Sequence, residues 1–208
     1  MTRKISHFSR QVLLGLIFFV IALTLRSALN AQTTPPSWPI AEAPGELRSV
    51  VPRADTIIVA MHDSVLRELT KALSRGGPDS AIGFCHLDAT FLSQRFGKEE
   101  GIAAGRTSDR LRNPTNAPRP WAAPLVKAYA GRQAKSVDGF VVDLGDRVGV
   151  LRPIAERTMC AGCHGPADRL SPGVLSVLAD RYPVDRAVGF RDGEIRGWFW
   201  VEMPKHRH

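Results

Sequence analysis

Five consecutive residues constrain this chain more than any other feature: Cys160-Ala161-Gly162-Cys163-His164. They match the Cys-x-x-Cys-His pattern of c-type haem attachment. Two thiols one helical turn apart can add to the two vinyl groups on one haem edge, while the adjacent histidine reaches the iron. The motif therefore predicts one covalently attached haem c per chain, held through Cys160 and Cys163, with His164 as an axial iron ligand.

Two other interpretations of the cysteine pair are weaker. A thioredoxin-like dithiol would need a βαβ setting, which the surrounding sequence lacks. Half of a zinc site would need a second ligand pair at suitable spacing, and none follows. The chain has three cysteines, an odd count that fits a disulfide framework poorly and leaves Cys85 to be explained.

The N-terminus has the features of an export signal. Thr2-Arg3-Lys4 begins a positive region, residues 12–25 form an apolar run, and Leu29-Asn30-Ala31 offers small residues for cleavage. The run is too short to span a bilayer comfortably, so residues 1–31 are predicted to be a signal peptide. An uncleaved membrane anchor stays open, because Leu29 and Arg26 make a mediocre cleavage site. In either case we expect a periplasmic location, where haem is attached to such motifs.

Charge adds little to the functional prediction. The net charge is +8, but the expected signal peptide holds four basic and no acidic residues, so its removal leaves +4. No Lys/Arg cluster with interleaved aromatics is present, and nucleic-acid binding is not expected. Hydrophobic content of 44% and charged content of 23% are typical of a globular domain.

The rest of the chain predicts a Pro-rich linker over residues 32–52 and one haem domain over residues 53–208. Apolar residues at helical spacing predict helices over residues 53–73 and 78–96. Residues 101–124, rich in Gly, Pro, Arg and Asn, are expected to be a long irregular connection. Further elements are expected as a helix over 121–129, strands over 140–142 and 148–151 with a turn near 145–146, a helix over 171–181 and a strand over 195–201. Helices and a small antiparallel sheet make an α+β domain.

The second axial ligand is left open by the residues alone. The candidates are Cys85, His86, His62, Met61 and Met159. A methionine on an apolar helical stripe is usually core packing, and a lone histidine is usually a surface residue. Cys85 differs because it is an unpaired thiol on the inward face of the predicted helix over residues 78–96. A buried free cysteine is nevertheless often only a small hydrophobic residue.

Several segments resemble a family of single-haem c-type proteins with a PAS-like fold. Its members occur as secreted bacterial proteins and as sensory regions of membrane histidine kinases. The departures are Phe190 where Tyr is usual and Glu194 where Asp is usual. The matching segments lie in order within residues 53–204: 81–85 (AIGFC), 105–108 (GRTS), 111–118 (LRNPTNAP), 153–154 (PI), 160–165 (CAGCHG), 182–190 (YPVDRAVGF) and 193–197 (GEIRG).

The resemblance implies a PAS-like antiparallel sheet flanked by helices, with N-terminal helices packing over the haem. It also implies His164 and Cys85 as the two iron ligands. The rival is His86, which becomes the better ligand only if the helix frays. A thiolate ligand donates strongly, favours ferric iron and lowers the reduction potential.

Arginines in the 105–118 segment are candidates for the haem propionates. Arg suits bidentate carboxylate contacts, so Arg106 or Arg112 is expected to pair with a propionate. Arg196 is a weaker candidate of the same kind. The alternative is that these side chains are solvated loop charges.

Two functions fit a haem of this type. One is redox or diatomic-gas sensing, in which CO, NO or O₂ binds the iron and a membrane sensor partner receives the signal. The other is electron transfer by a small soluble cytochrome c with a redox partner protein. An enzyme is not expected, because the sequence shows no distal Arg/His pair at recognisable spacing and no second haem motif.

Overall fold

A computed structural model describes residues 34–97 and 101–206, without the side chains of residues 79 and 84–97. Residues from Pro35 onward form one compact unit, whereas the expected signal peptide lies outside the described residues. The unit is an α+β domain built on a five-stranded antiparallel sheet in the order β1-β3-β4-β5-β2. This architecture confirms the predicted PAS-like fold class. None of the helices within the described ranges has the length and apolar character needed to cross a membrane.

The sheet takes its strands from distant parts of the chain. β3 and β4 form a hairpin whose turn lies near residues 145–146, as the sequence predicted, and Gly145 adopts a positive φ of 90° there. β5 pairs with β4 on one side and with β2 on the other. The strands are β1 (Ser37–Pro39), β2 (Ala103–Thr107), β3 (Phe140–Asp143), β4 (Arg147–Ala155) and β5 (Ile195–Pro204).

The main helix is α3 (Val51–Gly97), which breaks in its middle. Gly76 and Gly77 have non-helical backbone angles, with φ +65° at Gly77, and Pro78 starts the second segment. Proline lacks an N–H and suits a first helical turn, so the predicted division into two helices is confirmed. The other α-helices within the described residues are α2 (Gly45–Arg48), α4 (Ala123–Ala128), α5 (Ala161–His164) and α6 (Pro172–Arg181).

The expected linker over residues 32–52 is wrong from Ser37 onward. Ser37 of β1 pairs with Val142 of β3. The side chains of Ile40 and Leu47 are buried in the hydrophobic core of the domain. Short 3₁₀ and α turns, η1 (Ile40–Glu42) and α2, follow the strand. Prolines are tolerated here because β1 is an edge strand, where a missing N–H costs little. The proline content correctly indicated extended backbone at β1. It wrongly indicated that the segment does not pack against the domain.

The expected irregular connection over residues 101–124 is also wrong in part, because it contains β2. Its residues pair with β5 from Ala103 opposite Glu202 to Thr107 opposite Trp198. A side chain at Gly105 would come within 2.7 Å of the Trp200 ring. The small residues of β2 thus make room for the tryptophan, and they hide the strand from pattern recognition.

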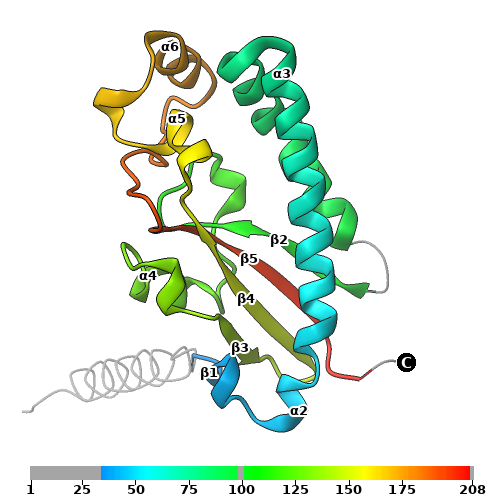
Figure 1. The fold of residues 1–208 in the computed structure, drawn as a ribbon. Helices are drawn as coiled ribbons and strands as arrows, with labels where there is room; N and C mark the ends of the chain where they lie inside the picture. The colour runs from blue at the N-terminus through cyan, green and yellow to red at the C-terminus, as the bar shows by residue number, and fades with distance from the viewer. Residues whose placement is uncertain (1–33, 98–100, 207–208) are drawn as a thin grey trace, which may run out of the picture. The chain divides into compact units, whose positions relative to one another are not determined.

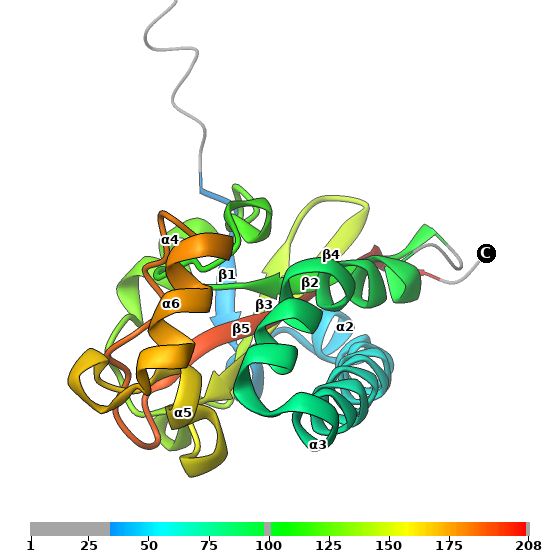
Figure 2. The ribbon, with the colours of Figure 1, turned by 90° about the horizontal axis from the view of Figure 1, so that it is seen from above.

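Alternating side chains give the sheet two buried faces. On β4, Val148 and Val150 face α2 and α3, whereas Leu151 faces α4 together with Trp198 of β5. Figure 1 shows α3 beside the sheet on one side and α4 on the other. A third cluster joins Ile82 of α3 to Leu170, Val174 and Leu178 around α6. Viewed from above, α5 and α6 lie beside the second segment of α3, which follows Pro78 (Figure 2).

Gly149 offers a test of the packing on the α4 face. A Cβ atom there would stand 2.9 Å from the buried Trp121 ring. Gly149→Val should lower the free energy of unfolding by about 1–3 kcal/mol, because overpacking forces the ring and strand apart. Urea unfolding of purified protein measures this. Gly45→Ala, where no atom lies within 4 Å of the added carbon, is the control and should change stability by less than about 0.5 kcal/mol.

Candidate haem site

The cysteine motif begins where β4 ends. A register shift between Ile154 and Ala155 ends the regular pairing with β5. A 3₁₀ turn, η5 (Thr158–Cys160), then runs directly into the single turn of α5. Cys160 and Cys163 therefore stand one turn apart, with half-buried side chains. This spacing is the one that attachment to two vinyl groups on the same haem edge requires.

His164 is held in one orientation by the loop that precedes β5. Its Nδ1 lies 2.8 Å from the Ala187 carbonyl oxygen, and its ring meets Phe190 edge-on. The pKa of His164 lies well below its usual range. Burial is the largest cause, and the positive charges of Arg196 and Arg112 lower the pKa further. The ring is therefore neutral, with Nδ1–H donating to the carbonyl and the Nε2 lone pair facing Arg196 Nη1 at 3.5 Å. This is how metal-ligating histidines are commonly oriented.

Arg112 fixes the loop that orients His164. Its Nε donates to Asp185 at 3.0 Å, and its Nη2 donates to the carbonyls of Cys163 at 2.6 Å and Ala187 at 3.3 Å. Asp185 in turn accepts the Ala187 N–H at 2.8 Å. Because the Arg112 and Asp185 side chains are only 9% and 10% exposed, this pair is a buried structural tie. Arg112 thus positions the motif histidine, a role that the expected propionate contact did not anticipate.

A cavity of about 430 Å³ opens in front of the motif. Its volume falls within the range typical of small-molecule and cofactor sites. The motif residues Cys160, Cys163 and His164 line one wall. The opposite wall comes from α3 and is mainly apolar, with the side chains of Ile58, Val59, Val65, Leu66, Leu69 and Leu73.

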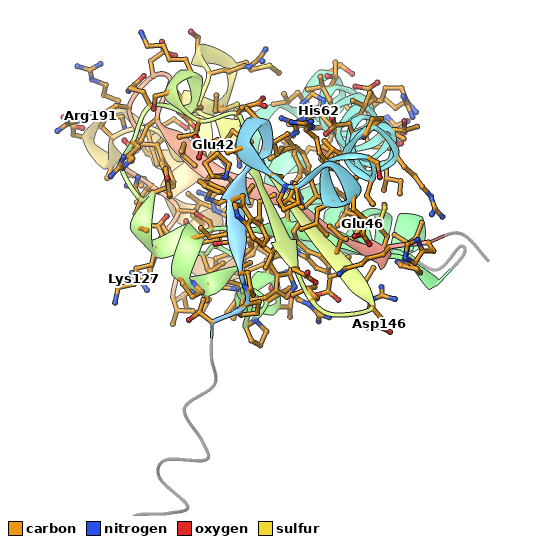
Figure 3. All side chains as sticks on the ribbon, turned by 90° about the horizontal axis from the view of Figure 1, so that it is seen from below. Glu42, Glu46, His62, Lys127, Asp146 and Arg191 are labelled. Atoms are coloured by element: carbon orange, nitrogen blue, oxygen red, sulfur yellow. The ribbon has the colours of Figure 1, made fainter. Side chains whose placement is uncertain are left out.

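The cavity lining is strongly basic. It includes Arg106, Arg110, Arg112, Arg152, Arg157 and Arg196, and no Asp or Glu from the described part of the chain. By contrast, Lys127 and Arg191 project outward from other parts of the domain (Figure 3). Several of the lining arginines are paired with acids that do not line the cavity. Arg110 pairs with Glu194, Arg112 with Asp185 and Arg196 with Glu156. Arg152 makes a bidentate contact with Asp55 at 2.6 and 2.8 Å.

Arg106 and Arg152 flank Phe199 in the sheet register, one on each neighbouring strand. Directly paired residues in an antiparallel sheet point to the same face, so both arginines face α3 with Phe199. His62 of α3 meets Phe199 edge-on at 5.8 Å. Two cationic side chains, Arg106 and Arg152, thus lie on either side of Phe199 on the sheet wall of the cavity.

The structure brings most of the predicted site residues together. Arg106, Arg112, Arg196, His62 and Met159 all line the cavity that holds the motif. Met61 does not: it is 0% exposed and belongs to the core between α3 and the sheet, as expected for a methionine on an apolar helical stripe.

The side chains of Cys85 and His86 lie outside the described residues. The backbone places both in the second segment of α3, one turn after Ala81 and Ile82, which line the cavity. The structure therefore leaves the choice of second iron ligand as a prediction.

Two largely buried residues near the motif were given no role in the sequence analysis. Asp185 stood in a matching segment but was assigned no role, although it anchors both Arg112 and Ala187. Glu156, just before the motif, is a buried carboxylate beside Arg196. Only its position between a strand and the haem motif could have pointed to Glu156 in the sequence. Its contact Arg196 lies about 40 residues away.

The arrangement suits a porphyrin with iron and two carboxylates. The buried atoms Thr107 Oγ1 and Arg196 Nε, both from cavity-lining residues, have no hydrogen-bond partner among the described residues. Unpartnered buried polar atoms indicate a place for a polar ligand group. Two cysteine side chains and an oriented imidazole lie beside a basic cavity, so the domain is of the kind that holds a haem.

Comparison with known proteins agrees with this fold and site. The family model described as Tll0287-like matches residues 23–204, so the chain belongs to this family. A solved structure, titled as that of the cyanobacterial heme-protein Tll0287, aligns with a TM-score of 0.57 at 20% identity, covering 80% of this chain and 99% of that chain. No curated protein matches the sequence.

Proposed function

We propose that this chain is an extracytoplasmic haem protein that binds one haem c through Cys160 and Cys163, with His164 as an axial ligand. The observation that carries the proposal is the orientation of His164. Its Nδ1 is engaged by Ala187 and its Nε2 faces the cavity-lining Arg196. The solved structure of a heme-protein with the same fold supports the choice of cofactor.

Bound haem would supply one-electron redox chemistry and, where a coordination position opens, a site for diatomic gases. The chain's own residues determine how it is held. Cys160 and Cys163 would hold the haem through their thiols, and His164 would bind the iron through Nε2. Arg196 Nη1 is 3.5 Å from that nitrogen, so its guanidinium has to move aside for the iron to bind. The apolar wall from α3 limits access of water to the opposite face.

Cys85 is proposed as the second axial ligand, with His86 as the rival. The family resemblance and the backbone position support it: Cys85 follows Ala81 and Ile82 by four and three residues. Residues at these spacings share one side of an α-helix, and both neighbours line the cavity.

Arg106 is proposed to pair with a haem propionate. Arg106→Gln should lower the reduction potential by about 50 mV, the effect of removing a unit charge roughly 15 Å from the iron at an effective dielectric of about 20. The loss of positive charge makes the extra negative charge of ferrous haem less favourable. Redox titration measures the shift, and Lys127→Gln, on the exposed side of α4, is the control. Equal potentials for Arg106→Gln and wild type would rule the contact out.

Redox or gas sensing is the function that the site supports best. A PAS-like module with an axial thiolate that detaches on reduction would open the iron to CO, NO or O₂, and a membrane sensor partner would receive the change. Met159 and Cys160 at the cavity edge favour a second candidate, an electron carrier. Met159 is 56% exposed next to the attachment cysteine, so a redox partner could approach the haem edge there.

One experiment separates the two functions. The periplasm-matured protein is reduced with dithionite, exposed to carbon monoxide and followed at the Soret band. A ready adduct with loss of thiolate bands supports sensing. An unchanged ferrous spectrum with fast, reversible electron exchange contradicts sensing and supports the carrier.

A further inference from the structure

Glu156 is a buried acid with an unusual lack of partners. Its side chain is 1% exposed, and neither carboxylate oxygen has a hydrogen-bond partner among the described residues. The nearest cation is Arg196, whose Nε lies 3.4 Å from Oε2 but makes no hydrogen bond to it. A buried carboxylate without hydrogen-bond donors is poorly stabilised in its ionised form.

The charges around Glu156 come from three segments and largely oppose one another. Arg196 on β5 and Arg112 after β2 favour the ionised carboxylate, whereas Glu194 and Asp192 before β5 favour the protonated one. Glu194 is itself paired with Arg110. Burial is the largest influence and raises the pKa of Glu156 to about 7. Near neutral pH the carboxyl group is therefore poised between its two protonation states.

Arg196 connects Glu156 to the iron ligand. Its guanidinium contacts Glu156 through Nε at 3.4 Å and stands 3.5 Å from His164 Nε2 through Nη1. The guanidinium moves aside when iron binds to Nε2, but Glu156 and His164 stay about the length of one arginine side chain apart. A charge that changes at the iron therefore acts on a nearby carboxyl group whose proton equilibrium is nearly balanced. At the effective dielectric of a protein interior, a unit charge at such a separation changes a proton affinity by about tenfold.

We infer that Glu156 takes up one proton when the haem site gains an electron and releases it when the site is oxidised. This inference rests on the proposed function. The electron comes from a one-electron donor, such as the redox partner proposed above, and the proton comes from solvent. An O–H bond forms on the Glu156 carboxylate as an O–H bond of hydronium breaks and leaves water. One electron and one proton enter the site together, so its net charge is conserved.

The sign follows from electrostatics. Reduction removes one positive charge from the iron, which raises the proton affinity of Glu156 by about tenfold. Between the two resulting pKa values, the reduction potential falls as pH rises. A one-electron couple with one proton falls by at most about 59 mV per pH unit, the potential equivalent of a tenfold change.

The test is redox titration of the haem-loaded protein from pH 5.5 to 8.5, with wild type, Glu156→Gln and Glu202→Gln. Glu202 is the matched control, a buried carboxylate that accepts hydrogen bonds from Arg119 and Trp121. Wild type and Glu202→Gln should show the falling potential, and Glu156→Gln should lose most of that slope. A wild-type potential independent of pH, or an equal slope in Glu156→Gln, overturns the inference.

Infrared difference spectra between oxidised and reduced protein provide a second readout, which needs only wild type if Glu156→Gln fails to fold. A protonated carboxyl C=O band should appear on reduction and shift with ¹³C-labelled glutamate. A spectrum without such a band overturns proton uptake by Glu156 while leaving haem binding intact. A protein that matures without haem overturns the proposed function, and the inference with it.

Discussion

Replacing His164 by alanine is expected to convert the ferric haem spectrum from low spin to high spin, because the iron loses its nitrogen ligand while the thioether bonds keep the haem in place. The substitution also leaves a cavity beside Phe190 and Ala187, where the ring now packs. The free energy of unfolding should fall by on the order of 3 kcal/mol. Absorption and electron paramagnetic resonance spectra measure the first effect, and thermal unfolding measures the second.

His62 offers the matched control for this experiment. It is a histidine of the same cavity, but its side chain is 50% exposed and lies against Phe199, with Asp63 3.3 Å from Nδ1. His62→Ala should leave the spin state unchanged. Added imidazole should restore the low-spin spectrum in His164→Ala. If His62→Ala shifts the spin state and His164→Ala does not, the assignment of the axial ligand is wrong.

The second large effect is expected at Cys85. Cys85→Ala should raise the reduction potential by on the order of 100 mV or more, since axial ligands set haem potentials over about 0.8 V. A thiolate stabilises ferric iron, so its loss favours reduction. The ferric spectrum should lose its thiolate charge-transfer bands, and carbon monoxide should bind the ferrous protein faster.

His86→Ala distinguishes the rival ligand. If Cys85 binds the iron, His86→Ala keeps the wild-type ferric spectrum and potential. A Cys85→Ala protein whose ferric spectrum matched that of wild type would refute thiolate ligation. A changed spectrum in His86→Ala alone would transfer the role to the histidine.

Local patterns in the sequence predicted the local elements of this fold. The helices over residues 53–73 and 78–96 follow from apolar spacing and from Pro78, and α6 begins where Ser171 was expected to cap it, with the Val174 N–H donating to its hydroxyl at 3.2 Å. β1 and β2 were missed because their pairing is remote: Ser37 pairs with Val142, and Ala103 with Glu202. Neither strand carries the alternation that pattern recognition needs.

The same distinction between local and remote residues applies to the candidate haem site. The haem motif could be predicted because its chemistry lies within five adjacent residues. The tie from Arg112 to Asp185 joins residues 73 positions apart, and its role in holding Ala187 against His164 depends on how two loops meet. The surroundings of Glu156 could not be predicted from the sequence for the same reason, because they depend on how distant segments meet. Its properties come from burial and from Arg196, neither of which the sequence near the motif encodes.

The central claim, that Cys160 and Cys163 hold a haem covalently, is tested most directly by the intact mass of the protein after maturation in a bacterial periplasm. After extraction with acidified acetone, the mass should equal that of the polypeptide plus one haem. The haemochrome spectrum should be that of a haem with two thioether bonds. A mass equal to that of the polypeptide alone, with haem recovered in the acetone, would contradict covalent attachment.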